Sequence, residues 1–85
     1  MHKTKEMEKA LKTVFLRGME LVKKDIMECD EEYDVVCYNF PYGTRVMNVL
    51  EENGIVEMVD NVLYLTTTPL DAINFIDCCV EMDDL

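Results

Sequence analysis

The most constraining feature of this chain is a helix-stopping glycine followed at once by two short β-rich runs. Asn53-Gly54 ends a helical pattern, because glycine readily takes the left-handed conformation at which many helices stop. The runs 55–59 and 62–66 are rich in Val, Ile, Leu and Tyr, and Asp60-Asn61 between them tolerates the positive φ of a two-residue hairpin turn. The sequence therefore predicts a helix ending near Asn53 and an antiparallel hairpin directly after it.

Longer helices are predicted on both sides of this unit. Apolar residues recur every three or four positions over residues 5–27, which indicates an amphipathic helix with Thr4 as its N-cap. A last helix over residues 69–82 opens at Thr68-Pro69, with threonine as N-cap and proline at the first helical position. Gly18 is unfavourable inside the first helix, so it predicts a close packing contact or a bend.

Residues 31–38 allow two interpretations. The favoured one is a short helix with Tyr33, Val36 and Cys37 facing inward. The alternative is a strand, because Val35 to Tyr38 are β-branched, aromatic or cysteine. After a turn at Asn39–Gly43, a third helix is expected from Tyr42 to Asn53. The predicted fold is one α+β, mostly helical domain over residues 1–85, ordered helix, helix, turn, helix, hairpin, helix.

The stretch FPYGTRVMNVLEENGIV, residues 40–56, resembles the recognition helix and first wing strand of the winged helix-turn-helix superfamily. Over residues 30–66 the chain is similar to the DNA-reading gamma domain of bacterial FtsK translocases. The resemblance implies a winged helix-turn-helix with a long N-terminal helix, a two-stranded wing and a C-terminal helix. In DNA-binding members the third helix enters the major groove. It would there present four residues to the bases: Tyr42, Thr44, Arg45 and Asn48.

Charge argues against DNA as the partner. The chain has a net charge of −10. Residues 1–24 hold seven Lys and Arg against three Glu, whereas residues 25–85 hold one base, Arg45, against fifteen acids. The wing, residues 55–66, has no Lys or Arg, although phosphate contacts supply most nonspecific DNA affinity. On this view Arg45 pairs with Glu51, Glu52 or Asp60 on a solvated surface.

An acidic body attracts basic surfaces. Small acidic phage and mobile-element proteins, including many anti-CRISPR and anti-restriction inhibitors, resemble this chain in size and charge. The expected function is therefore a non-enzymatic protein-binding module that occupies the basic surface of a nucleic-acid-handling protein. The alternative is a winged-helix DNA-binding regulator that reads DNA with residues 42–48. The carboxylates expected to bind the partner are Glu51, Glu52, Glu57 and Asp60.

Catalysis, metals and cofactors are not expected. The chain has no serine and its one histidine is His2, so no Ser–His or Cys–His couple can be assigned. The three glycines are isolated, which excludes a glycine-rich phosphate loop. The four cysteines do not have zinc-site spacing, and we expect reduced thiols packed as small hydrophobes: Cys29, Cys37, Cys78 and Cys79.

The distribution of apolar residues along the chain indicates where the protein is located and how it assembles. No apolar run approaches the roughly 20 residues that cross a bilayer, and residues 1–6 do not begin a signal peptide. We therefore expect a soluble, cytoplasmic protein without a membrane partner. The first and last helices are more apolar than one buried face requires, which is typical of helices that pack on a partner. A homodimer through residues 5–27 and 69–82 is expected.

Overall fold

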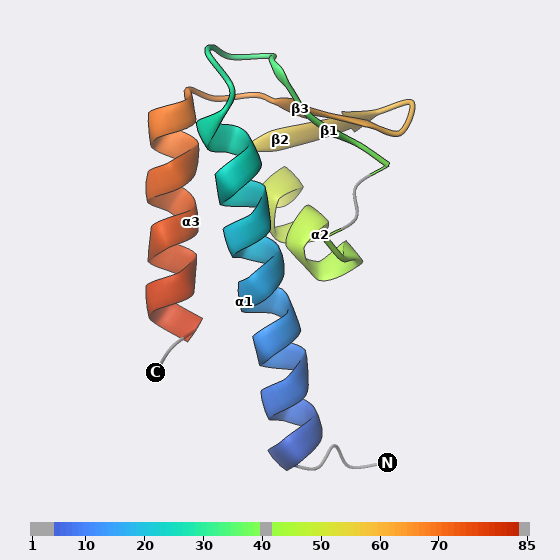
Figure 1. The fold of residues 1–85 in the computed structure, drawn as a ribbon, viewed down its shortest axis with the longest axis vertical. Coiled ribbons are helices and arrows are strands. Elements are labelled where there is room, and N and C mark those ends of the chain that lie inside the picture. The colour runs from blue at the N-terminus through green and yellow to red at the C-terminus, as the bar shows by residue number, and fades with distance from the viewer. Residues whose placement is uncertain (1–4, 40–41, 84–85) are drawn as a thin grey trace.

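A computed structural model describes residues 5–39 and 42–83. The fold is α+β, with three helices and an antiparallel sheet of strand order β1-β3-β2. Figure 1 shows α1 and α3 side by side, with the sheet across one end of this pair and α2 beneath the sheet. The elements in chain order are α1 (Lys5–Met27), β1 (Val35–Tyr38), α2 (Thr44–Glu52), β2 (Val56–Val59), β3 (Val62–Leu65) and α3 (Pro69–Asp83).

The predicted hairpin is confirmed. β2 and β3 pair antiparallel from Val56↔Leu65 to Val59↔Val62. Asp60 and Asn61 form the turn with φ of 50° and 66°. At the end of α2, the Gly54 N–H donates to the Glu51 carbonyl at 3.1 Å and the Ile55 N–H to the Leu50 carbonyl at 2.9 Å. With Gly54 at φ 70°, these bonds form the expected glycine stop of the helix.

The favoured helix over residues 31–38 is wrong. Val35–Tyr38 form β1, which pairs with β3 through Val35↔Tyr64 and Tyr38↔Val62, with a bulge between Val35 and Cys37. The free edge of β3 offers backbone N–H and C=O groups that need partners, and β-branched and aromatic side chains fit a half-buried pleated surface. Within the described residues, two helices rather than three therefore precede the hairpin, and the sheet has three strands.

The remaining helix predictions agree with the structure within about two residues. α1 spans Lys5–Met27, although its expected cap, Thr4, lies outside the described residues. α2 falls inside the range expected for the third helix, and residues 40 and 41 of the preceding turn also lie outside the described residues. The Thr68 hydroxyl accepts a hydrogen bond from the Asp71 N–H at 3.2 Å, which confirms the N-cap of α3.

Gly18 provides a close packing contact rather than a bend. A Cβ at this position would lie 2.7 Å from the Tyr42 carbonyl oxygen and 2.8 Å from Cγ2 of Val46. The glycine therefore allows the start of α2 to approach the backbone of α1. The core that forms around this crossing joins all three helices and the sheet, and its largest fully buried side chains are Met19, Val22, Ile26, Val46, Leu50, Leu63, Leu65 and Ile76.

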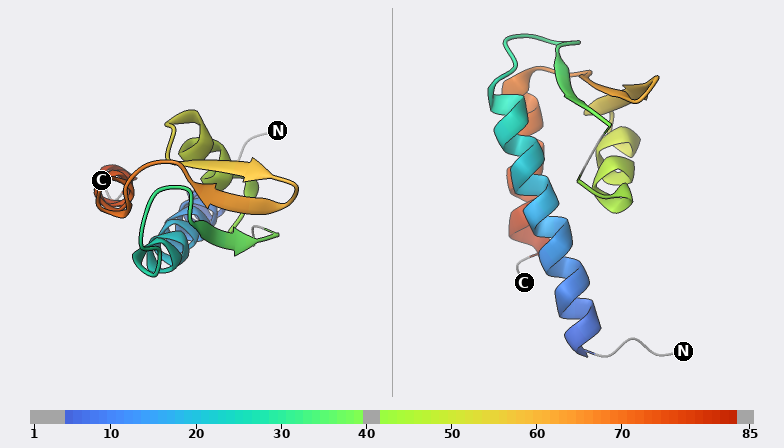
Figure 2. Two further views of the ribbon diagram at one scale, coloured as in Figure 1. Left: turned by 90° about the horizontal axis from the view of Figure 1, so that it is seen from above. Right: turned by 45° about the vertical axis from the view of Figure 1, so that its right-hand side comes forward.

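The first part of α1 extends beyond this core. Its N-terminal turns project past the ends of α2 and α3, as Figure 1 and the right-hand view of Figure 2 show. We call residues 5–14 the α1 arm; all of them except Lys12 are exposed, including Met7, Leu11 and Val14. Within the described ranges, no helix combines the length and apolarity needed to cross a membrane.

Candidate protein-binding surface

The sheet has one face on the core and one face toward solvent. Along β3, Leu63 and Leu65 are buried while Val62 and Tyr64 are half-buried, and along β2 Val56 is buried while Glu57 is exposed. This alternation follows from the period of two along a strand. The helices pack on the buried face, so the other face is available to a partner. We call it the outer sheet face: Val35, Tyr38, Glu57, Val59, Val62 and Tyr64.

The strand register arranges these six residues in two rows across the sheet. Tyr38, Val62 and Val59 form one row, because Val62 pairs with Tyr38 on one side and with Val59 on the other. Tyr64 likewise pairs with Val35 and Glu57 in the second row. Five of the six side chains are thus aromatic or β-branched. Aromatic residues such as the two tyrosines are enriched in protein interfaces, and here three valines extend the apolar surface around them.

Carboxylates lie on the outer sheet face and at both ends of its strands. Asp60 lies in the hairpin turn at one end, and exposed Glu57 lies on the face itself. The loop before β1 carries four further acids over residues 30–34. Three of them line a hollow with the start of α3: Asp30, Glu31 and Glu32, beside Thr68 and Pro69. An apolar centre with carboxylates at both ends fits a partner surface whose apolar residues are flanked by Lys or Arg.

The four carboxylates expected to bind a partner are all exposed, but they belong to two elements. Glu57 and Asp60 lie on the hairpin, at the outer sheet face and its turn. Glu51 and Glu52 end α2, whose buried residues pack with the inner face of the sheet. The structure therefore divides the set into a hairpin pair and a helix pair.

The four residues expected to read DNA do not share one outward face. Tyr42 is half-buried where the chain crosses Gly18. Thr44 and Asn48 are exposed one turn apart on α2, with Glu51 one turn further along the same side. Arg45 turns to the neighbouring flank, where its guanidinium carbon lies 4.3 Å from the centre of the Phe15 ring of α1.

The Arg45–Phe15 contact is a cation–π interaction. Among the described residues Arg45 forms no ion pair with Glu51, Glu52 or Asp60, so the predicted surface pairing is wrong. The ring of a buried aromatic residue offers a planar cation a closer partner than flexible, solvated carboxylates do. The one basic residue beyond residue 24 is therefore already engaged within the chain.

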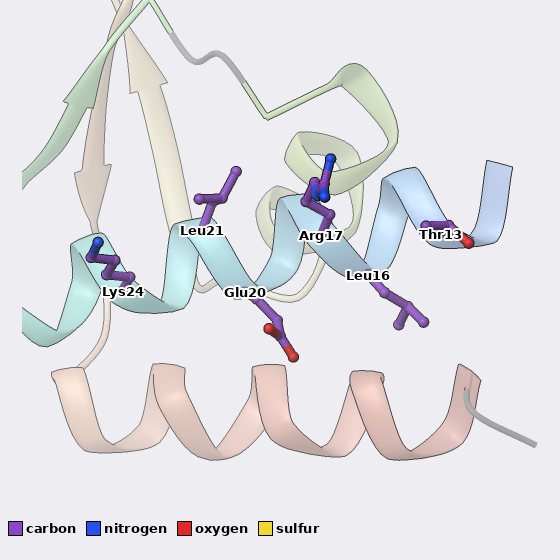
Figure 3. A pocket seen from close by; sticks show the side chains of 6 residues that line it. All are labelled: Thr13, Leu16, Arg17, Glu20, Leu21 and Lys24. Carbon is purple, nitrogen blue, oxygen red and sulfur yellow. The ribbon is translucent and has the colours of Figure 1, made fainter. Parts of the chain in front are cut away.

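A separate hollow lies on the exposed side of α1. Figure 3 shows its lining: Leu16 and Glu20 point toward α3, whereas Arg17, Leu21 and Lys24 point away from it. All lining residues come from this one helix. The hollow is therefore a feature of a helix surface and lacks the converging polar groups that a small-molecule site requires.

The cysteines supply no metal or catalytic centre in the described part of the chain. No group of three or more His, Cys, Asp or Glu in these residues is placed to hold a metal ion. Burial raises the pKa of the Cys29 thiol from 9.0 to about 11, with the Asp34 carboxylate as the next cause. A thiol with so high a pKa is a poor nucleophile at neutral pH. Cys78 is the exposed cysteine of the four.

Comparison of the chain with protein-family models, curated proteins and solved structures finds no match.

Sequence reasoning missed the outer sheet face. Its two rows require β1, and Val35 to Tyr38 were expected in a helix. The signal was present in the same four residues, whose β-branched and aromatic side chains favour a strand. With β1 paired to β3, Tyr38 and Tyr64 come to one face.

Proposed function

We propose that this protein is a non-enzymatic binding module that docks its outer sheet face onto the basic surface of a nucleic-acid-handling protein and so competes with nucleic acid. One observation carries the proposal: the apolar, tyrosine-bearing outer sheet face has carboxylates at both ends of its strands and Glu57 on the face itself. Tyrosines supply contact area at low entropic cost, and these acids attract Lys and Arg.

The charge of the whole chain supports this proposal. Fifteen acids and one base beyond residue 24 repel phosphate and accelerate encounter with basic proteins. The alternative, a winged-helix regulator, would need Arg45 to leave the Phe15 ring in order to read a base. It would also need phosphate contacts that the hairpin, which lacks Lys and Arg, does not offer.

The test uses a panel of purified nucleic-acid-binding proteins and a labelled DNA duplex, each titrated against the wild-type protein at low and high salt. We expect a panel member to bind with an association rate that falls with salt, and added nucleic acid to compete with it. We expect no binding of the duplex. Nanomolar, sequence-specific duplex binding that Arg45→Ala abolishes would overturn the proposal in favour of the regulator.

Matched variants locate the surface. Tyr38→Ala removes a side chain that is 69% exposed, and Met82→Ala removes one that is 74% exposed near the end of α3 that is distant from the sheet (Figure 1). We expect Tyr38→Ala to weaken the complex at least about tenfold and Met82→Ala to leave it unchanged, since truncation of a tyrosine that anchors an interface costs about 2 kcal/mol or more.

Double charge reversals at different positions change the net charge by the same amount, so differences among them report the effect of position alone. Glu57→Lys/Asp60→Lys should slow association strongly, whereas Glu20→Lys/Glu81→Lys, away from the sheet, should have little effect. Glu51→Lys/Glu52→Lys reports whether the helix pair also contacts the partner. Equal slowing by the hairpin pair and the distant pair would mean that charge acts only at long range and that the outer sheet face is not the docking surface.

A further inference from the structure

The exposed side of α1 carries a line of apolar side chains with a repeat of seven. Met7, Val14 and Leu21 succeed one another at this interval, and all three are exposed. Because a helix turns about 100° per residue, positions seven apart lie within about 20° of each other. The three side chains therefore form one stripe that runs from the α1 arm to the level of α2. We call it the α1 seam: Met7, Val14 and Leu21.

We propose that the α1 seam is the contact surface for a second copy of this chain, and that the two α1 helices pack antiparallel about a two-fold axis at Val14. The spacing makes the seam self-complementary. With Val14 opposite Val14, Met7 of each copy lies opposite Leu21 of the other. An isologous contact requires this kind of self-matching. The proposal concerns a different surface from the outer sheet face and does not depend on the proposed function.

In an antiparallel dimer, opposite charges beside the seam would lie next to each other. Glu6 and Lys24 are eighteen residues apart, which is five full turns, so both lie on the same flank of α1 and both are exposed. In an antiparallel pair this flank faces its own counterpart, and Glu6 of one copy comes beside Lys24 of the other. Two-fold symmetry produces the pair twice. Lys23, the neighbouring base, is already bound to Asp77 at 2.7 Å.

The surface beside the seam is hollowed where the second arm would lie. Val14 and Leu21 line one hollow with Tyr42 and Gly43, where the chain crosses α1. Val14 also lines a second hollow on the other side of this crossing, with Leu11 and Thr44. Projection of the α1 arm past the body leaves it able to reach the hollow at Val14 and Leu21 on another molecule (Figure 2). The arm and its receptor are thus both present on each copy.

α1, rather than α3, supplies this contact. The apolar residues of α3 are largely used within the fold, since Ala72 and Ile76 are buried and Ile73, Phe75, Cys79 and Val80 pack against the core. Exposed Leu70 and Met82 are twelve residues apart and do not form a continuous stripe with each other.

The test is the mass of the protein by sedimentation equilibrium from low to high micromolar concentration. Wild type should be a dimer in the upper part of this range. Val14→Glu should be monomeric throughout, because it places two carboxylates on the two-fold axis. Met27→Glu is the matched control: Met27 is 64% exposed and Val14 63%, but Met27 lies about 140° around α1 and should leave the dimer intact. Circular dichroism verifies that each variant is folded.

A charge exchange tests the antiparallel register. Glu6→Lys and Lys24→Glu should each weaken dimerisation about tenfold, since each turns two attractive pairs into repulsive ones. The combined variant Glu6→Lys/Lys24→Glu should recover wild-type affinity. A monomeric wild type at high micromolar concentration, or a Val14→Glu protein that remains dimeric, would show that a second copy does not occupy the seam. A dimer without recovery in the combined variant would overturn the antiparallel register.

Discussion

Along α1, Met7 and Met19 belong to the same amphipathic helix but differ completely in their surroundings. Met19 is 0% exposed between the other helices and the sheet, whereas Met7 is 53% exposed on the arm. Residues 15–26 form the anchored half of the helix, and the α1 arm continues the same hydrophobic spacing without a neighbour from α2 or α3 beside its first turns (Figure 1). Apolar periodicity thus indicates which side of a helix can be buried. The length of the neighbouring elements determines where along the helix that burial occurs.

The largest expected difference in stability is between truncation of a methionine in the anchored half and truncation of a methionine in the α1 arm. Met19→Ala should lower the free energy of unfolding by about 2–5 kcal/mol, because it leaves a cavity in the core. Met7→Ala should change it by less than about 0.5 kcal/mol. Urea unfolding at low micromolar concentration, followed by circular dichroism, measures both. Similar losses in the two variants would mean that the arm is buried in solution.

Gly18→Ala probes the crossing that fixes α2 on the anchored half. The added Cβ meets the Tyr42 carbonyl and Val46, so we expect a loss of about 1–3 kcal/mol even though alanine is the better helix former by about 1 kcal/mol. Thr13→Ala on the arm is the control and should be neutral or slightly stabilising. Thermal or urea denaturation of the pair distinguishes the results, and a stabilised Gly18→Ala protein would contradict the close contact.

Cys29, which is buried just beyond the anchored half, should make the stability of the protein depend on pH in the alkaline range. The pKa of Cys29 is raised from 9.0 to about 11 in the folded protein, so the folded state favours the neutral thiol. Its contribution to stability is fully present below about pH 9 and is lost as pH rises toward 11. Urea unfolding of wild type and Cys29→Ala from pH 8 to 11 isolates this contribution. The gap in unfolding free energy between the two proteins should shrink across this interval, and a constant gap would refute the prediction.

The smallest effect is expected for the ion pair that joins the anchored half to α3. Lys23 Nζ lies 2.7 Å from the Asp77 carboxylate, but both side chains are partly exposed. A double-mutant cycle with Lys23→Ala and Asp77→Ala should give a coupling of about 0.5 kcal/mol that decreases in high salt. Lys9→Ala on the arm provides the comparison and should not be coupled to Asp77→Ala. Coupling of equal size for Lys9 would indicate only a general effect of charge.

Local signals were sufficient to predict much of the fold. Asp60-Asn61 and Gly54 specify their own backbone conformations, and Thr68 caps its own helix, so the hairpin and the start of α3 were predictable from a few neighbouring residues. β1 was not, because Val35 to Tyr38 become a strand only when β3 offers an edge about 25 residues later in the chain.

The candidate site, like the fold, could be predicted only in part. Exposed carboxylates such as Glu57 could be named from composition and spacing. Which of them share a surface depends on strand register, and the register became known only with β1 in place. The contact of Arg45 with Phe15 likewise joins two elements that no sequence spacing connects. Spare apolar residues on the first helix were foreseen, but which part of that helix stays exposed was not, because the reach of α2 and α3 along α1 is a property of the assembled fold.

The strand order β1-β3-β2 has a consequence for the protein during its synthesis. The central strand of the sheet is the last one to leave the ribosome, so β1 waits with an unpaired edge until residue 65 is available. The β2–β3 hairpin closes locally, and the pairing of β1 must then close a longer loop at a higher entropic cost. α1 waits longer still for α3. A growing chain therefore holds apolar residues of α1 and β1 in water until β3 and α3 have left the ribosome, a period in which a nascent chain is exposed to aggregation and to chaperones.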